Sequence, residues 1–380
     1  MFRNFHETGL PFSSWFHKEP KIATRPAGKS REGLCAKIVA TAFHAPPTIE
    51  TSGELASKIG RSDDWILSRT GIRKRRIADE PVEVLAARVA RAALAAGPAP
   101  DLILNASTTA RQLIPDTSVF VQDQLGLEGI PSFSIHATCL SFLVALNTSV
   151  SLVASGAYRR VLVVSAELGS RARNMREPES AALLGDGAAA AIVEPTPENE
   201  TSALLGWRMT TWPKGAALSE LPGGGMRCHP NDPATRPEHN LFTMNGPRLF
   251  KMARQPVMAL VHDLLDQCGL RMDEVNLVVP HQASGPALEV LSKWLGVENE
   301  RLVNIVADYG NCIAASIPMA LAHADSAGRL RRGDRVLLLG TGAGLSVAGA
   351  LLRWEGPCSN VFIRRTAWRA RPSARGCRGC

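Results

Sequence analysis

The sequence lacks the patterns that mark secreted, membrane-spanning and disulfide-stabilised proteins. Its eight cysteines show no repeated spacing and so predict no disulfide framework. The N-terminal segment has no continuous apolar stretch of the secretory kind. The long apolar run after Cys139 is interrupted by the polar residues Asn147, Thr148 and Ser149, which argues against a membrane span. We therefore expect a reduced, cytoplasmic protein with no membrane partner.

The excess of positive charge lies at the two ends of the chain. Of the formal net charge of +8, residues 1–36 contribute +3 (six Lys/Arg, three Glu) and residues 355–380 contribute +5 (six Arg, one Glu). Residues 37–354 are therefore formally neutral, which argues against a nucleic-acid partner because such partners need a clustered basic face. We predict an irregular basic N-terminal extension and a basic C-terminal tail. Cys377 and Cys380 in that tail are half a metal motif, so no metal site is predicted.

The neutral body contains the same order of elements twice. In each half an alanine-rich or amphipathic helix precedes an apolar strand, and a second apolar strand follows. The expected helices cover residues 81–96 and 249–268, and the expected strands cover 101–106, 159–164, 276–281 and 334–339. Leu104 and Leu162 are 58 residues apart, and Leu277 and Leu337 are 60 apart. Apolar strands that alternate with helices predict an α/β protein, and the matched spacing predicts an internal duplication.

The repeat divides the body into residues 37–200 and 201–354. Cys139 lies 35 residues after Leu104, and Cys312 lies 35 residues after Leu277. At both positions a polar segment changes to an apolar one that opens a helix. Pseudo-two-fold symmetry would therefore bring the two helix starts, and Asn311 with the second, face to face.

Cys139 is the candidate nucleophile. We expect an apolar helix from Cys139 to Ser155, whose unpaired N–H groups and dipole would favour the reactive thiolate. A lone cysteine is more often an inert core residue. Here the repeat supplies partners: Asn311 at the matching helix start, and His281 at the end of the matching strand, where ligand sites of α/β proteins gather.

A cysteine, a histidine and an asparagine around one cavity suit acyl transfer. Cys139 would attack a thioester, and its own N–H and that of Gly344 in the glycine-rich turn would bind the oxyanion. His281 and Asn311 would donate hydrogen bonds to a second thioester carbonyl. Such a pair stabilises an enolate, which carbon–carbon bond formation next to a thioester requires.

Seven short motifs also occur in a characteristic order. They cover residues 62–72, 137–139, 184–188, 279–283, 309–311, 316–318 and 342–344. With the 30-residue spacing from His281 to Asn311, they resemble the β-ketoacyl-acyl carrier protein synthase III family of the thiolase-like superfamily.

The resemblance implies a five-layered αβαβα fold built from two duplicated halves, and a homodimer. It implies that an acyl-CoA acylates the cysteine, and that a malonyl thioester on acyl carrier protein then undergoes decarboxylative condensation without a cofactor. Trp65 would stack on the CoA adenine, and Arg69 and Arg171 would lie near its phosphates. Residues 73–76 (Arg-Lys-Arg-Arg), and Arg248, Lys251 and Arg254 at helical spacing, are two candidate docking patches for the acidic carrier.

Some segments depart from the family pattern. Residues 112–117 and the glycine loop 221–225 raise a secondary-metabolism member with a longer acyl primer as an alternative to an acetyl-CoA enzyme of fatty-acid initiation. We interpret Cys312 as packing and His136 as a core or cavity-lining residue.

Two rival activities stay open. One is acyl transfer to a hydroxyl or amine, which the presence of Asn311 disfavours. The other is head-to-head condensation of two acyl thioesters, or pyrone or resorcinol formation. A degradative thiolase is disfavoured because the glycine turn has no second cysteine, and a non-enzymatic subunit because Cys139, His281 and Asn311 are all present.

Overall fold

The computed structural model describes residues 33–95 and 97–356, and these form one compact unit. Most of the predicted N-terminal extension, nearly all of the basic tail and the Cys377–Cys380 pair lie outside the described residues. Within the described ranges no helix is long and apolar enough to cross a membrane. The five cysteines located there form no disulfide.

The first sheet has five strands in the order β1-β7-β6-β4-β5. Their bounds are β1 Ala36–His44, β4 Leu102–Asn105, β5 Ser132–Ser134, β6 Val161–Leu168 and β7 Asp186–Pro195. Strand β4 runs parallel to β5 and β6, whereas β7 is antiparallel to both β6 and β1. The central strands are buried along their whole apolar length, as expected of a sheet covered on both faces.

The second sheet repeats this arrangement in the order β11-β12-β13-β8. Its strands are β8 Ala203–Thr211, β11 Leu277–Pro280, β12 Arg335–Gly342 and β13 Ser346–Arg353. Strands β11 and β12 are parallel, and β13 is antiparallel to β12 and to β8. Strand for strand this matches β4-β6-β7-β1, so the two sheets have the same topology. Only the first sheet has an additional edge strand, β5.

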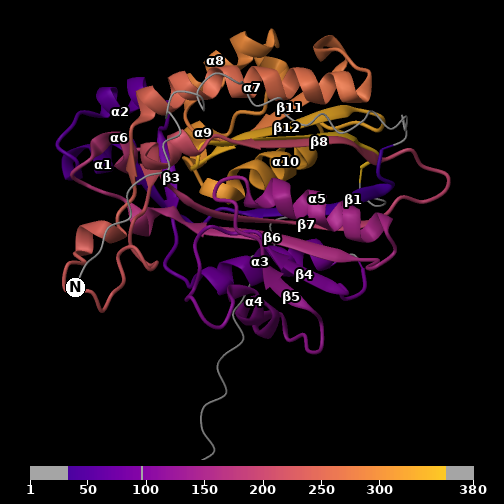
Figure 1. Ribbon diagram of the computed structural model, residues 1–380, viewed down its shortest axis with the longest axis horizontal. Helices are drawn as coiled ribbons and strands as arrows, with labels where there is room; N and C mark the ends of the chain where they lie inside the picture. The colour runs from indigo at the N-terminus through magenta and orange to yellow at the C-terminus, as the bar shows by residue number, and fades with distance from the viewer. Residues whose placement is uncertain (1–32, 96, 357–380) are drawn as a thin grey trace, which may run out of the picture. The chain divides into compact units, whose positions relative to one another are not determined.

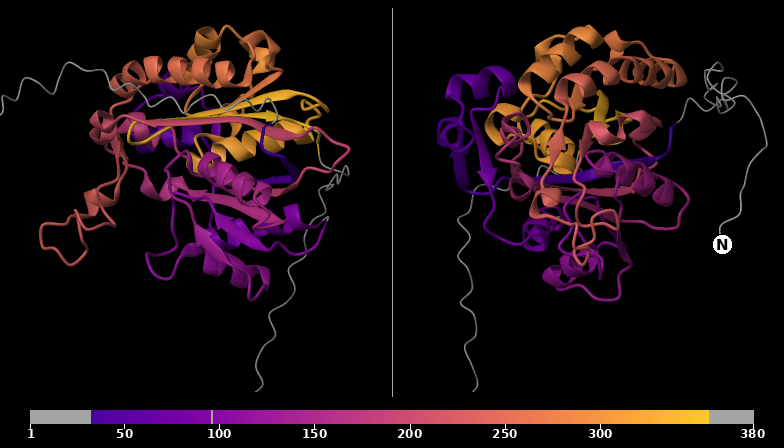
Figure 2. Two further views of the ribbon diagram at one scale, coloured as in Figure 1. Left: turned by 45° about the vertical axis from the view of Figure 1, so that its right-hand side comes forward. Right: turned by 60° about the vertical axis from the view of Figure 1, so that its left-hand side comes forward.

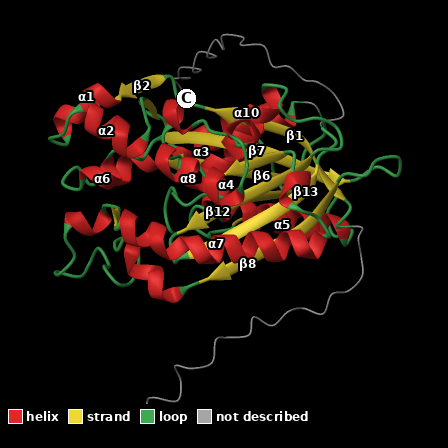
Figure 3. Cartoon of the chain, turned by 90° about the horizontal axis from the view of Figure 1, so that it is seen from above, coloured by secondary structure: helices red, strands yellow, loops and turns green. Residues whose placement is uncertain are grey.

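Helices separate and cover the two sheets (Figures 1 and 2). Between the sheets lie α5 (Ser141–Ala154) and α10 (Ser316–Ser326), each packed on strands of both. Helices α3 (Val82–Leu94) and α4 (Thr117–Leu125) cover the outer face of the first sheet. On the outer side of the second, α7 (Gly246–Cys268) crosses β8 and β13, with α8 (Gly285–Leu295) beside it (Figure 3). The five layers are therefore α, β, α, β, α.

Smaller elements build the rim of the molecule. They are α1 (Ser52–Lys58), α2 (Asp63–Thr70), α6 (Pro178–Ala181), α9 (Val306–Tyr309), β2 (Thr48–Thr51), β3 (Lys74–Ile77), β9 (Ser219–Glu220), β10 (Thr243–Met244), and the 3-10 helices η2 (Gly169–Ala172), η3 (Pro213–Leu218), η4 (Pro237–Asn240), η5 (Met272–Glu274), η6 (Asn299–Arg301) and η7 (Ile313–Ala315). Helix α2 follows its local sequence closely. The Ser62 hydroxyl caps its first turn by accepting the N–H of Trp65 at 3.1 Å, and Gly71 ends it in the left-handed conformation.

The two central helices begin later than the sequence predicts. Helix α5 starts at Ser141 with Leu140 as N-cap, so Cys139 precedes the helix and is not in its first turn. After Asn311 the chain first forms η7, and α10 begins only at Ser316. In both places a residue with positive φ, Thr138 (52°) or Ile313 (47°), turns the backbone before regular helix begins.

The basic run at residues 73–76 is not a solvent-facing patch, contrary to our expectation. Arg75 is completely buried and donates to the carbonyl oxygen of Ala182 at 2.6 Å. Arg73 and Lys74 both pair with Asp308, at 3.1 and 3.4 Å. The reason is that Lys74, Arg75 and Arg76 belong to strand β3, in which the side chain of Arg75 faces inward.

We predict that Arg75→Ala lowers the free energy of unfolding by about 3 kcal/mol, because it leaves a cavity and an unpaired buried carbonyl. The exposed Arg73→Ala variant should lower it by less than about 1 kcal/mol, since surface ion pairs contribute little. Urea unfolding followed by circular dichroism measures both. Equal midpoints for the two variants would show that the burial of Arg75 does not stabilise the fold.

Candidate active site

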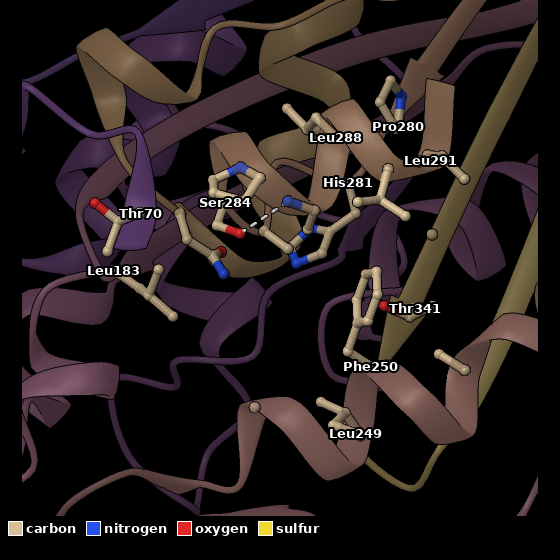
Figure 4. Close-up of a pocket in the computed structure, with 18 of the residues that line it drawn as sticks. Thr70, Leu183, Leu249, Phe250, Pro280, His281, Ser284, Leu288, Leu291 and Thr341 are labelled. Carbon is tan, nitrogen blue, oxygen red and sulfur yellow. Dashed lines mark hydrogen bonds between the residues drawn. The ribbon is translucent and has the colours of Figure 1, made fainter. Parts of the chain in front are cut away.

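One cavity of about 540 Å³ opens between the outer helices and the ends of the second sheet's strands. Its wall is mainly apolar and comes from α2, α7, α8 and the carboxyl ends of β11 and β12. His281 points into it, near Phe250 of α7 and Thr341 of β12 (Figure 4). Ser284 caps α8 at its edge, accepting the N–H of Ala287 at 3.3 Å. The structure thus places a mostly apolar chamber at the carboxyl ends of parallel strands, where the sequence predicts a site.

His281 is held by a rigid turn. Its own N–H donates to the carbonyl of Leu339, at 2.8 Å. The buried amide of Gln282 donates to the carbonyls of Pro280 and Val303 and accepts the N–H of Ile305, all within 3.0 Å. Burial lowers the pKa of His281 to about 4, so the imidazole is uncharged at neutral pH. A neutral imidazole keeps one N–H donor and one acceptor nitrogen.

Asn311 lies on the wall of the same cavity. Its backbone is fixed from both sides: its N–H donates to the carbonyl of Leu183 at 2.9 Å, and its carbonyl accepts the N–H of Gly185 at 3.0 Å. Its side-chain oxygen accepts the N–H of Ile313 at 2.9 Å. Because the oxygen is engaged there, the side chain offers its NH₂ group to the cavity as a donor.

Cys139 lies behind this wall, in the turn before α5. A Cβ atom at Gly340, which lines the cavity, would lie 2.8 Å from the side chain of Leu140 and 3.4 Å from the Cβ of His281. The missing side chain of Gly340 therefore lets the turn of Cys139 and the side chain of His281 approach the same strand end. The side chain of Cys139 itself does not line the cavity as the structure has it.

The environment of Cys139 does not favour the thiolate, contrary to our prediction. Cys139 is half-buried, and its surroundings raise the pKa of the thiol to about 12, with burial as the larger cause and the nearby carboxylate of Glu167 as the smaller. The N–H groups of Cys139 and Ala343 hydrogen-bond to the sulfur and oppose this rise without cancelling it. Ala343 immediately precedes Gly344, the residue that the sequence proposes for the oxyanion site.

The three predicted CoA-binding residues lie in different surroundings. Arg69 is exposed on α2 and lines the cavity. Trp65, one turn earlier, is half-buried with Arg61 over its ring at 5.3 Å, and does not line the cavity. Arg171 is exposed on η2, also away from the cavity wall.

Helix α2 reaches the cavity through a glycine contact. A Cβ atom at Gly71 would lie 3.0 Å from the Cα of Gly285, the first residue of α8. Gly71 also has φ of 68°, which favours glycine. This backbone approach brings Arg69 beside the start of α8.

The second predicted docking patch is exposed at the cavity mouth. Arg248, Lys251 and Arg254 project from the first turns of α7, next to the cavity-lining Phe250. The rings of Phe250 and Trp294 pack at 4.9 Å, and Arg254 lies over Trp294 at 5.8 Å.

Cys312 and His136 lie in different surroundings. Cys312 is buried and packs near Gly187 and Met319, which agrees with its interpretation as a packing residue. His136 is exposed, so its assignment to the core or the cavity wall is wrong. Sequence reasoning missed Glu167, whose only signal was a single acid within an otherwise apolar strand.

Known proteins share these features. The family model described as 3-oxoacyl-[acyl-carrier-protein (ACP)] synthase III matches residues 133–212, which contain Cys139, and the model of its C-terminal part matches residues 265–354, which contain His281 and Asn311. A β-ketoacyl-[acyl-carrier-protein] synthase III of Streptomyces coelicolor is 37% identical over 319 residues, covering 81% of this chain and 94% of that protein. The chain belongs to the β-ketoacyl-acyl carrier protein synthase III family.

Solved structures agree with the assignment. A 3-oxoacyl-(acyl carrier protein) synthase III from Pseudomonas aeruginosa is 32% identical with a TM-score of 0.77, covering 84% of this chain and 98% of that one. A priming β-ketosynthase from a polyketide biosynthetic pathway is 29% identical with a TM-score of 0.77, covering 87% and 99%. The predicted family, thiolase-like fold and enzyme class are confirmed: this β-ketoacyl synthase III is a condensing acyltransferase of fatty-acid or polyketide biosynthesis.

The raised pKa of Cys139 makes a pH prediction. Below its pKa a thiol alkylates in proportion to its small thiolate fraction, so the rate with iodoacetamide should rise about tenfold per pH unit from pH 7 to 10 without a plateau. Peptide mass spectrometry follows the modification of Cys139, with Cys139→Ser as the control for its assignment. A plateau near pH 8 would contradict the raised pKa of this thiol.

Proposed function

We propose that Cys139 accepts an acyl group from an acyl-CoA and that the enzyme then condenses it with a malonyl group on acyl carrier protein. The observation that carries the proposal is the junction at the ends of β11 and β12. There His281 and Asn311 face one cavity, and the turn of Cys139 packs against the same strand end.

In the first half-reaction the Cys139 sulfur attacks the acyl-CoA carbonyl. The thiol is protonated at rest, so its proton must leave as the carbon–sulfur bond forms; the CoA thiolate departs and takes up a proton. The N–H of Cys139 and an N–H of the glycine turn, for which we keep Gly344 as the candidate, hold the oxyanion. Removing one such donor costs about 10²–10³ in rate.

In the second half-reaction the malonyl thioester loses CO₂ and leaves an enolate. His281 and Asn311 donate hydrogen bonds to its oxygen, and both can do so without a positive charge. The enolate carbon attacks the acyl carbonyl on Cys139, and the Cys139 sulfur leaves. The product is a β-ketoacyl thioester.

These steps need no bound metal or cofactor, because the thiol and four hydrogen-bond donors supply the chemistry. We also propose the cytoplasm as the location, since the free cysteines of the described residues suit a reducing compartment. For the CoA, Arg69 at the cavity rim is the best supported contact, while Trp65 and Arg171 remain proposals that rest on the family motif.

A longer acyl primer is the alternative to acetyl-CoA that the sequence raised. Leu113 and Ile114, from the segment that led to this suggestion, are 79% and 85% exposed, so within one chain they do not shape the cavity. Leu113 and Ile114 can therefore shape the pocket for the acyl primer only where another chain covers them.

We propose a homodimer formed through this face. The edge strand β5 has one unpaired side, and the apolar side chains of Leu113, Ile114, Val119 and Phe133 are exposed around it. An open edge beside exposed apolar groups favours pairing with a second copy.

The first functional prediction separates condensation from simple acyl transfer. Incubation with a panel of acyl-CoAs should add the acyl mass to the wild type but not to Cys139→Ala, and malonyl carrier protein should then release a β-ketoacyl product. Asn311→Ala should still be acylated but should condense about 10²–10³ times more slowly, because one donor to the enolate is lost.

Intact-protein mass spectrometry measures both steps. Acylation that survives in Cys139→Ala would refute the nucleophile. Acylation without condensation in the wild type would favour the acyltransferase alternative, and a product from two acyl-CoAs alone would favour head-to-head condensation.

The exposed patch on α7 generates a second prediction. Lys251→Glu with Arg248→Glu should raise KM for malonyl carrier protein about tenfold by opposing an acidic partner. Hydrolysis of the acyl-CoA should be unchanged. The matched control is Arg159→Glu with Arg331→Glu, two exposed residues before the amino ends of β6 and β12, and equal KM values for both double variants would remove the docking role of α7.

A further inference from the structure

Glu167 is a buried acid that the mechanism above does not use. It lies near the end of β6 and is completely buried in an otherwise apolar strand. Its carboxylate accepts the N–H of Thr108 at 2.6 Å, and the N–H and hydroxyl of Thr109, both at 2.9 Å. These donors belong to the loop that follows β4.

The same carboxylate reaches the other half of the molecule. Strand β6 packs against η7, and the N–H of Ala314 in η7 faces the carboxylate. The preceding N–H, that of Ile313, holds the side-chain oxygen of Asn311 at 2.9 Å. One buried acid therefore joins the loop after β4 to the turn that orients Asn311.

We propose that Glu167 is a positioning residue for condensation, fixing the turn that carries Asn311 against the first sheet, close to Cys139. The proposal rests on the proposed function of that site. A carboxylate suits this task because it has only acceptor sites when ionised, and three hydrogen bonds from Thr108 and Thr109 hold it where the N–H of Ala314 faces it. A carboxylate held this way would orient the NH₂ group of Asn311 through its turn. Misplacing such a donor by 1 Å costs on the order of 10²-fold in rate.

The charge of Glu167 has a second effect. Burial raises its own pKa to about 7, against the lowering effect of its hydrogen bonds. The titratable groups that it faces are the thiols of Cys139, before α5, and Cys312, before η7, and its negative charge raises the pKa of both. Removing the charge should therefore make the Cys139 thiolate easier to form.

Glu167→Gln tests the proposal because it keeps the size but replaces one acceptor oxygen with a donor. We expect acylation of Cys139 to stay within about threefold of wild type, and condensation to fall about 10–10²-fold. Alkylation of Cys139 by iodoacetamide should become faster at a given pH, and hydrogen exchange at the amides of Ile313 and Ala314 should become faster.

The matched control is Glu83→Gln. Glu83 is a buried acid of α3, on the outer face of the first sheet, and its carboxylate accepts a hydrogen bond from Arg111 at 2.6 Å. Its variant should lose stability without changing condensation or Cys139 alkylation. If Glu167→Gln does not fold, Glu167→Asp keeps the charge but shortens the reach, and should slow condensation without accelerating alkylation.

Unchanged condensation in a folded Glu167 variant would overturn the proposal, as would equal losses of acylation and condensation with unaltered exchange at residues 313 and 314. The exchange and alkylation measurements need no substrate. If the wild type fails to condense, the proposed function fails, while these two measurements still decide whether Glu167 holds the turn.

Discussion

Both sheets bury their inner faces on the same two helices, α5 and α10, and the rest of the molecule depends on this shared layer. Because the sheets have the same topology, the carboxyl ends of β4 and β6 from one half and of β11 and β12 from the other meet near the starts of these helices. Cys139 and Asn311 belong to different halves for this reason. Neither half alone contains the reacting set, so the packing of the halves is itself part of the site.

Burial acts in the same direction on three titratable groups of the site. Burial lowers the pKa of His281, raises that of Cys139 and raises that of Glu167, so each is moved toward its uncharged form. A reaction that creates an oxyanion and then an enolate in such surroundings must be supported by donors already in place. The hydrogen bond of Gln282 holds the turn of His281, and that of the Asn311 side-chain oxygen orients the NH₂ group. Both donors are therefore in place before a substrate binds.

The sequence predicts the features that depend on spacing and fails on those that depend on burial. The matched strand distances identify the duplication, and the positions of Cys139, His281 and Asn311 follow from it. In contrast, Arg75 reads as part of a surface patch, because nothing local reveals that a strand of four residues turns it inward beneath Ala182. The thiol of Cys139 fails as a predicted thiolate for the same reason. Its ionisation is set by burial first and by the carboxylate of Glu167 second, and Cys139 lies two residues before the first residue of α5.

The contact between Gly71 and Gly285 joins the two halves at the substrate entrance without any side chain. Where side chains mediate a contact, the neighbouring side chains can usually repack around a substitution. Here a Cβ atom on Gly71 or Gly285 would lie 3.0 or 3.1 Å from the Cα atom of the other glycine, so helices α2 and α8 would have to move apart. Helix α2 and the half that carries His281 and Asn311 are therefore held at a fixed separation: a side chain that projects from α2, such as Arg69, can be replaced, but α2 itself cannot move without moving α8.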